Sequence, residues 1–364
     1  MLFYVWGEEN RMKNRGTKWL VLMVVMAMLS LVLAGCGGGD KKPAAPAAPA
    51  SPDKAKITGK LMIYTSIYPD IIEVVKPALK KAFPDLDVQW FQAGTEKVIT
   101  KVSGEIEAKK IQADLLMVAD PSYYFLLKEK NLLLKYDAPN RKDVTAAKDA
   151  EGYWTGVRIS NMIIAYNTAK VKPEDAPKTF KELTEPKWKD KVAIPSPLLS
   201  GSAYVAVGVI ADKYGWDYFT KLRANGAKVE AGNAAIQNKL VTGEYLAGMI
   251  LEENILKIMA KGEPIKVVYP EDGTIVIPSP IAIFNSTQNP EAAKAVTDWW
   301  LSKEGQEAIV KGWMHSVRGD VAPPKGAPEL KTFLTKGDLK PNWDKLSKEM
   351  EKTKGEFQKI MDAK

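Results

Sequence analysis

The chain has 364 residues, 46% of them hydrophobic, with 10 tryptophans and a formal net charge of +8. This length and composition allow two domains of ordinary size with substantial cores. The basic balance favours anionic membranes or anionic solutes as partners. The chain has 1 cysteine, which excludes a disulfide framework and a cysteine-based metal site.

Residues 1–35 are typical of a secretory signal peptide, in which an apolar segment follows a basic start. The apolar run 19–35 leads into LAGC, residues 33–36, which resembles the lipobox of bacterial lipoproteins. The resemblance implies that Cys36 is lipidated and becomes the first residue of the mature chain. A transmembrane anchor is the alternative, because the run is almost long enough to span a bilayer. Met12 is the expected true start.

A spacer follows the cysteine. Residues 36–56 are rich in Gly, Pro and Ala, a composition that acts as a flexible linker. It is expected to hold a folded body, residues 57–364, away from a membrane. Nucleic acid is not an expected partner of an exported body.

The first half of the body alternates strand patterns with helix patterns. The segments are 60–66, 85–93 and 113–120 for strands, and 71–83, 96–109 and 123–133 for helices. This alternation predicts an α/β fold with a mainly parallel sheet. Asp70 is the expected cap of the first helix. Ligands of such sheets bind at the carboxyl ends of strands, here the turns at 64–68, 93–95 and 119–122.

The second half repeats the pattern between two long extended runs. Residues 152–168 and 267–284 could cross between lobes. The segments between them are a strand at 191–197, a helix from Ser202, a strand at 246–251 and a helix at 252–262. Residues 289–313 are predicted to be helical. A stripe in the tail is expected to pack against the body: Trp343, Leu346, Met350, Phe357 and Ile360.

No motif of an enzyme is evident in the sequence. The chain has 1 histidine, His315, for which the sequence shows no carboxylate partner, so a structural role is expected. The zinc-protease, phosphate-loop, C-x-x-C and G-x-S-x-G patterns do not occur. The body is therefore predicted not to be an enzyme, and no cofactor is expected.

The body resembles the type II periplasmic solute-binding proteins of ABC importers. More narrowly, it is similar to the branch that holds binders of ferric iron, 2-aminoethylphosphonate and sugar phosphates. The matching segments cover most of residues 60–320, and among them are IYTSIYPD, QADLLMVADPSYYFLLKEKNLL, GYWTGVRISNMIIAYNT, SGSAYVAVGVIADKYGWDYF, GEYLAGMILEE and VRGDV.

The resemblance implies a two-lobed fold. Each lobe is expected to be a mainly parallel sheet flanked by helices, with a cleft and a hinge between the lobes. The expected limits are 57–158 plus 274–318 for lobe 1, 159–273 for lobe 2 and 319–364 for a C-terminal helical segment. The hinge is expected near 157–163 and 272–278.

The stretch at 200–202 indicates the ligand class. A helix beginning there offers unpaired N–H groups and the positive end of a dipole, which suit an anion. Ser200 and Ser202 add hydroxyl donors, and Gly201 allows close approach of the backbone; a plain helix cap is the alternative. Further candidate ligand residues are Ser66, Thr95, Asp120, Asn233 and Glu252. Two arginines, Arg158 and Arg318, could neutralise an anion or form structural ion pairs.

Ferric iron is the alternative ligand. Iron binders of this branch typically use a His or Gln region, a Glu and paired tyrosines, all oxygen or nitrogen donors. This chain has Tyr68, Asp120 and the run 250–253 (ILEE) at the corresponding places, and Tyr123-Tyr124 lies on a predicted helix as core. These departures favour an organophosphonate or a sugar phosphate.

The predicted function is that of a monomeric, lipid-anchored receptor outside the cytoplasm. It would capture a small anionic solute between its lobes and deliver it to an ABC permease and ATPase. Two other classes stay open. One is a surface lipoprotein for sensing or adhesion without transport, and the other, more distant, is a hydrolase of organophosphates.

Overall fold

A mixed sheet runs through the body. The computed structural model describes residues 56–363 apart from 146, 336 and 338, and the nine strands found there form one sheet. Its order is β2-β1-β3-β9-β4-β7-β5-β6, and β8 pairs with β4. The strands are β1 (Gly59–Thr65), β2 (Leu86–Gln92), β3 (Leu115–Met117), β4 (Thr155–Asn167), β5 (Val192–Pro195), β6 (Lys228–Glu230), β7 (Ala247–Leu251), β8 (Ile265–Val268) and β9 (Ile275–Ile283).

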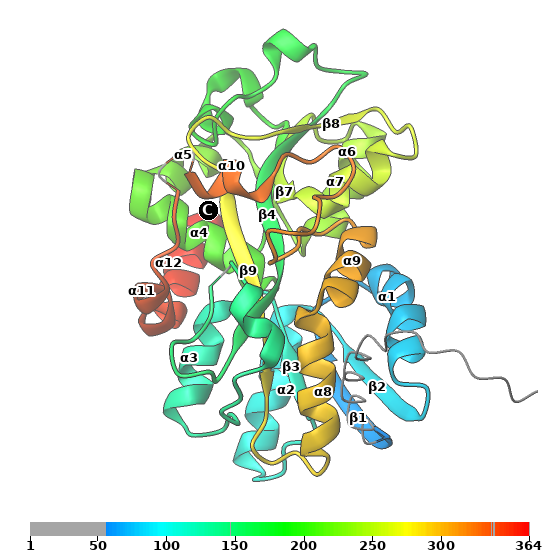
Figure 1. Ribbon diagram of the computed structural model, residues 1–364. Helices are drawn as coiled ribbons and strands as arrows, with labels where there is room; N and C mark the ends of the chain where they lie inside the picture. Colours follow the sequence, from blue (N-terminus) through cyan, green and yellow to red (C-terminus); the bar gives the residue numbers. More distant parts are fainter. Residues whose placement is uncertain (1–55, 146, 336, 338, 364) are drawn as a thin grey trace, which may run out of the picture. The chain divides into compact units, whose positions relative to one another are not determined.

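The first lobe is built on β1, β2 and β3. β1 pairs in parallel with both of its neighbours, and successive side chains enter opposite cores, with Ile63 on one face and Tyr64 on the other. The helices of this lobe are α1 (Pro69–Ala82), α2 (Thr95–Glu107), α3 (Pro121–Glu129), α8 (Pro290–Leu301) and α9 (Lys303–Lys311). In Figure 1, α1, α8 and α9 lie beside one another near β1 and β2.

The second lobe is built on β5, β6 and β7, again with parallel pairing about a central strand. Ile194 and Ala193 of β5 point into the two cores of this lobe. Its helices are α4 (Gly201–Tyr214), α5 (Asp217–Ala224), α6 (Asn233–Thr242) and α7 (Glu252–Met259). The described residues also form the 3-10 helices η1 (Pro139–Asp143), η2 (Pro173–Asp175), η3 (Lys181–Thr184) and η4 (Pro186–Trp188).

Two antiparallel strands, β4 and β9, join the lobes (Figure 1). Their pairing runs from Thr155 opposite Ile281 to Met162 opposite Ile275, with a register shift between Gly156 and Arg158. Every residue of β4 is buried. Its start contributes to the core of the first lobe and its end to the core of the second, so the strand belongs to both.

The α/β class with a two-lobed arrangement is confirmed. The pairs of β1 with β2 and β3, and of β5 with β6 and β7, are parallel, whereas β4, β8 and β9 pair antiparallel with their neighbours. The residue limits of the lobes stay predictions. One detail is wrong: Tyr68, and not Asp70, is the N-cap of α1. Pro69 starts the helix because its fixed φ suits the first helical position. Asp70 instead forms an ion pair of 2.6 Å with Lys257 of α7.

The C-terminal segment contains α10 (Leu330–Thr335), α11 (Trp343–Lys348) and α12 (Met350–Asp362). Leu346 and Phe357 are buried in the core that contains α4 and α5. Trp343, Met350 and Ile360 pack against the same core. The predicted apolar stripe is therefore confirmed.

Among the described residues, no helix is both long and apolar enough to cross a bilayer. The predicted signal peptide, Cys36 and the linker as far as residue 55 lie outside the described residues. The lipid anchor accordingly stays a prediction.

Candidate functional site

A cavity of about 370 Å³ lies between the two lobes. Both lobes and the strand that joins them contribute to its wall. The polar residues of the wall are Ser66, Tyr68, Thr95, Arg158, Ser200, Ser202, Asn233 and Glu253. The predicted ligand residues Ser66, Thr95, Ser200, Ser202 and Asn233 are thus brought together, although their role as ligands stays a prediction.

Several helices begin at the wall of this cavity. The N-cap residues Tyr68, Gly94, Ser200, Gly232 and Leu251, which precede α1, α2, α4, α6 and α7, all line it. The first N–H groups of a helix have no partner within the helix, and the helix dipole adds partial positive charge there. The cavity therefore gathers backbone donors and positive potential from both lobes.

Serine hydroxyls supplement these donors. The Ser66 Oγ accepts a hydrogen bond of 3.1 Å from the Ala119 backbone N–H, which leaves its own hydrogen available. The Ser200 Oγ lies 3.1 Å from the Ser202 Oγ and accepts from the Ala203 N–H at 3.4 Å. Ser200 therefore does cap α4, as the alternative had it, and lines the cavity as well.

A buried cation and a buried anion face the cavity together. Arg158 and Ser160 lie on the same face of β4 because strand side chains alternate. The Arg158 guanidinium donates to the Ser160 Oγ at 2.9 Å, and that hydroxyl donates to Glu253 Oε1 at 2.9 Å. Arg158 is 3% and Glu253 4% exposed. The Arg158 Nε finds no hydrogen-bond partner among the described residues.

Burial shifts the titration of these groups. It raises the pKa of the Glu253 carboxyl, while the charge of Arg158 opposes that rise. Burial also lowers the pKa of Arg158. Desolvation, followed by the charge of Glu253, raises the pKa of the Tyr68 phenol. Tyr68 therefore presents a neutral hydroxyl to the cavity.

Glu252 does not line the cavity. It lies on the opposite side of β4, where Asn161 donates to it at 2.7 Å and Tyr269 at 2.6 Å. The His315 Nε2 lies 2.9 Å from the Glu252 Oε2, the same oxygen that accepts from Asn161. The carboxylate partner that the sequence does not reveal for His315 is thus Glu252. The neighbouring Glu253 is the carboxylate that reaches the cavity, because adjacent helical residues point about 100° apart.

Asp120 and Gly201, two further predicted ligand residues, lie near the cavity but not in its wall. Asp120 is fully buried and caps α3 by accepting from the Ser122 N–H at 3.0 Å, and burial raises its pKa to about 6. Gly201 brings α4 against the first lobe. A Cβ at this position would lie 2.6 Å from the Thr95 Cγ2 and 2.9 Å from the Ala119 carbonyl oxygen. Neither residue lines the cavity, and their predicted role as ligand residues stays a prediction.

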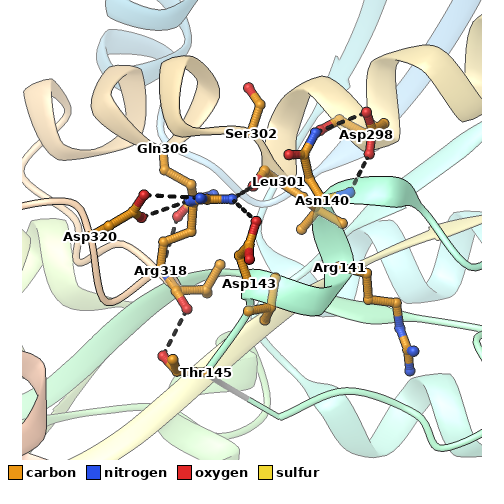
Figure 2. A network of polar contacts seen from close by, with 12 residues as sticks. Asn140, Arg141, Asp143, Thr145, Asp298, Leu301, Ser302, Gln306, Arg318 and Asp320 are labelled. Carbon is orange, nitrogen blue, oxygen red and sulfur yellow. Dashed lines mark hydrogen bonds and ion pairs between the residues drawn. The ribbon is translucent and has the colours of Figure 1, made fainter.

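Arg318 lies in a separate network and not in the cavity (Figure 2). Its guanidinium donates to Asp320 at 2.8 and 3.0 Å and to Asp143 at 3.1 Å. It also donates to the Leu301 carbonyl at 3.2 Å. These contacts tie the end of α8 to η1 and to the segment after α9. Of the two interpretations of this arginine, the structural ion pair is the one supported.

Tyr68, Arg158 and Glu253 line the cavity although they are not among the ligand residues predicted from the sequence. Tyr68 precedes Pro69 shortly after the end of β1, a signal of a helix start at the carboxyl end of a strand. Arg158 lies in the long extended run that was expected to cross between the lobes. Among the described residues, no group of three or more His, Cys, Asp or Glu side chains could hold a metal ion.

Comparisons with known proteins identify the family and the fold. The model of the family of bacterial extracellular solute-binding proteins matches residues 111–349. A probable ABC transporter periplasmic-binding protein, y4fP of Sinorhizobium fredii, is 26% identical over 234 residues, which are 58% of this chain and 64% of that protein.

Two solved structures share the fold. The periplasmic binding protein AfuA of Actinobacillus pleuropneumoniae, with fructose-6-phosphate bound, matches with a TM-score of 0.75 and 24% identity, over 84% of this chain and 99% of that chain. Iron-bound HitA of Pseudomonas aeruginosa matches with a TM-score of 0.72 and 20% identity, over 82% of this chain and 99% of that chain. The chain belongs to the family of bacterial extracellular solute-binding proteins, the periplasmic solute receptors of ABC transporters.

Proposed function

We propose that this receptor binds a small organic anion, a sugar phosphate or an organophosphonate, in the cavity between its lobes. The observation that carries the proposal is the convergence of the starts of α1, α2, α4, α6 and α7 on that cavity. Backbone N–H groups at helix starts bind phosphate groups well, since their hydrogens and the helix dipoles point at the anion. Ser66, Thr95, Ser200 and Ser202 would add hydroxyl donors.

The buried arginine supports the same ligand class. Arg158 is neutralised only through Ser160, and its Nε lacks a partner among the described residues. A phosphate or phosphonate oxygen would satisfy this donor and add a charge-assisted hydrogen bond. AfuA, which shares the fold, holds a sugar phosphate.

Glu253 favours a solute that is more than a bare anion. A carboxylate in the wall repels a second negative charge, and it accepts hydrogen bonds from hydroxyl or amino groups. A phosphate group at the helix starts and a hydroxyl or amine at Glu253 would complement the cavity. A sugar phosphate and an aminoalkylphosphonate both have this arrangement.

Ferric iron is the second candidate. The Glu253 carboxylate and the Tyr68 hydroxyl lie in the same cavity, and oxygen donors of this kind suit hard cations. HitA, which shares the fold, holds iron. The Tyr68 phenol is neutral, and the helix starts carry partial positive charge. Both features favour an organic anion over ferric iron.

Capture would work by closure. The lobes would hinge about β4 and β9, and a ligand with contacts to both would favour the closed arrangement by its differential affinity. The permease would recognise the closed form. We further propose that Cys36 carries the lipid that holds the receptor at the outer face of the cell membrane. Incorporation of labelled palmitate, lost in Cys36→Ser, would test the anchor.

A thermal-shift panel on the purified protein tests the ligand class. The panel holds fructose 6-phosphate, 2-aminoethylphosphonate, inorganic phosphate and ferric citrate. A ligand at one hundred times its Kd should stabilise the protein by about 2.7 kcal/mol. Stabilisation by an organophosphate or phosphonate is the expected result. It should be lost in Ser200→Ala/Ser202→Ala and kept in the control Ser347→Ala, a half-buried serine that does not line the cavity.

Two outcomes would contradict the proposal. Stabilisation by ferric citrate alone would return the chain to the iron binders. No stabilisation by any small solute would favour a sensing or adhesive lipoprotein.

A further inference from the structure

The C-terminal segment is anchored in the second lobe. Leu346 of α11 and Phe357 of α12 are buried in its core, where Phe357 packs edge-on against Phe219 at a ring distance of 5.4 Å. Tyr204 of α4 donates a hydrogen bond to the Leu346 carbonyl. Gly208 leaves room for Leu346, since a Cβ there would collide with its Cδ2. These contacts fix α11 and α12 to the helix that begins at the cavity.

The same segment reaches the first lobe. The Lys354 Nζ of α12 lies 2.7 Å from the Glu96 Oε2 of α2, and the two side chains are 10% and 15% exposed. The ammonium also lies 5.4 Å from the centre of the Tyr204 ring. In Figure 1, α11 and α12 lie beside α4 and next to α3 of the first lobe, against which α11 packs.

The position of Glu96 connects this pair to the cavity. It directly follows Thr95, which lines the cavity and lies against Gly201. Burial raises the pKa of the Glu96 carboxyl, and the charge of Lys354 opposes that rise. Loss of Lys354 would therefore leave a desolvated carboxylate without its cation, which is unfavourable in the closed arrangement.

A second pair between the lobes has a different environment. Asp70 and Lys257 lie 2.6 Å apart, but their side chains are 53% and 23% exposed. Solvent screens such a pair, so it contributes little. The geometry points to Glu96 and Lys354 as the stronger polar link.

We infer that Lys354 is a positioning residue for ligand capture. Its ion pair with Glu96 clamps α2 of the first lobe to α4 of the second beside the cavity. The C-terminal segment thereby helps to set the closed arrangement, although none of its described residues lines the cavity. The inference rests on closure of the lobes and not on the chemical class of the solute.

Hydrogen exchange of the full-length protein without any solute tests the clamp. Lys354→Met should increase exchange about tenfold in peptides that cover 94–98 and 199–203, because separated lobes expose these helix starts; couplings of this size are typical. Lys345→Met is the matched control. It removes a lysine of the same segment whose partner, Asp212, lies on α4 of the same lobe. The control should leave both peptides unchanged.

A charge exchange separates the clamp from general folding. Glu96→Gln should act like Lys354→Met, and Glu96→Lys/Lys354→Glu should restore protection of both peptides. Unchanged exchange in both single variants would overturn the inference. The inference would also be overturned if hydrogen exchange in α5 and α8 rose in both single variants as much as in peptides 94–98 and 199–203. An increase in these two peptides in Lys345→Met equal to that in Lys354→Met would overturn it as well. Because no solute is present, failure of the proposed ligand class would not affect the result.

Discussion

Two buried arginines meet their counter-charges in different ways. Arg318 contacts Asp320 and Asp143 directly and also a backbone carbonyl, so the protein occupies its donors (Figure 2). Arg158 meets Glu253 only through the Ser160 hydroxyl, and its Nε lacks a partner among the described residues. The first arginine holds segments together, whereas the second has a donor without a partner among the described residues.

Incomplete neutralisation of a charge in a cavity is a better sign of function than a complete ion pair. A buried charge without full compensation is unfavourable, so it persists where a ligand completes it. The pKa of Asp320 is lowered by hydrogen bonds from Arg318, as in a structural pair. The pKa of Glu253 is raised by burial instead.

The largest expected effect is on ligand affinity in Arg158→Met. Loss of a buried charged donor should raise the Kd for the organophosphate that binds best by about 100-fold to 1,000-fold, since truncating such a partner typically removes several kcal/mol. Isothermal titration calorimetry at constant salt measures the change. Arg158→Lys keeps the positive charge, so its Kd should lie between those of wild type and Arg158→Met. An equal loss in Arg318→Met would remove the distinction between the two arginines.

Asp120→Asn should change the pH dependence of stability. The folded protein keeps this proton to about pH 6, whereas the free carboxyl releases it near 3.8, because burial raises the pKa. The resulting stabilisation is present below pH 3.8 and is lost as the pH rises to about 6. Relative to wild type, the variant should therefore gain about 2–3 kcal/mol between pH 4 and pH 7.

Urea denaturation at each pH measures this difference. Two charged groups lie near Asp120: Glu96 raises the pKa of Asp120, and Lys354 lowers it. Lys354→Met should therefore move the pH at which the stabilisation is lost to a higher value. The prediction would be contradicted if the free energy of unfolding changed with pH in the same way in wild type and in Asp120→Asn.

Arg318→Met should affect stability and leave binding unchanged. Loss of its hydrogen bonds to two carboxylates should lower the free energy of unfolding by about 1.5–3 kcal/mol, the range for charged hydrogen bonds. Urea denaturation gives the stability, and calorimetry on the same sample should return the wild-type Kd. A weaker affinity at full stability would place Arg318 in the binding machinery.

Glu253→Gln should alter selectivity. Without the negative charge, inorganic phosphate should bind about threefold to tenfold more tightly, whereas 2-aminoethylphosphonate should bind more weakly by a similar factor. Calorimetry with both compounds measures the ratio of their affinities. Glu252→Gln, on the other face of β4, should leave that ratio unchanged.

The smallest effect is expected in Ser202→Ala. One neutral hydrogen bond contributes about 0.5–1.5 kcal/mol, so the Kd should rise about threefold to tenfold. Ser347→Ala serves as the surface control in the same titration. A Kd equal to that of wild type would leave Ser202 as a packing residue between α4 and Asn233.

The sequence predicts most of the fold because local patterns determine it. Apolar alternation, helix spacing and proline positions locate the strands and helices to within a few residues. Ser66, Thr95 and Ser200 follow from the rule that cavities form at the carboxyl ends of strands. The exact start of α7 is not evident from the sequence, and one residue there decides whether Glu252 or Glu253 faces the cavity.

Long-range contacts are what local patterns do not reveal. Lys354 and Glu96 are separated by 258 positions, and nothing near either residue indicates the other. The same holds for His315, whose partner Glu252 lies on α7. For Arg318, the two aspartates come together only after η1 and the segment beyond α9 have folded.

The convergence of helix starts on the cavity also has a kinetic consequence. Partial positive charges that share one concave wall produce a field extending into the solvent, and such fields attract anions from a distance. The association rate of an anionic solute should therefore fall steeply with ionic strength, while its dissociation rate changes little. A receptor built in this way has its highest association rate for an anionic solute at low ionic strength.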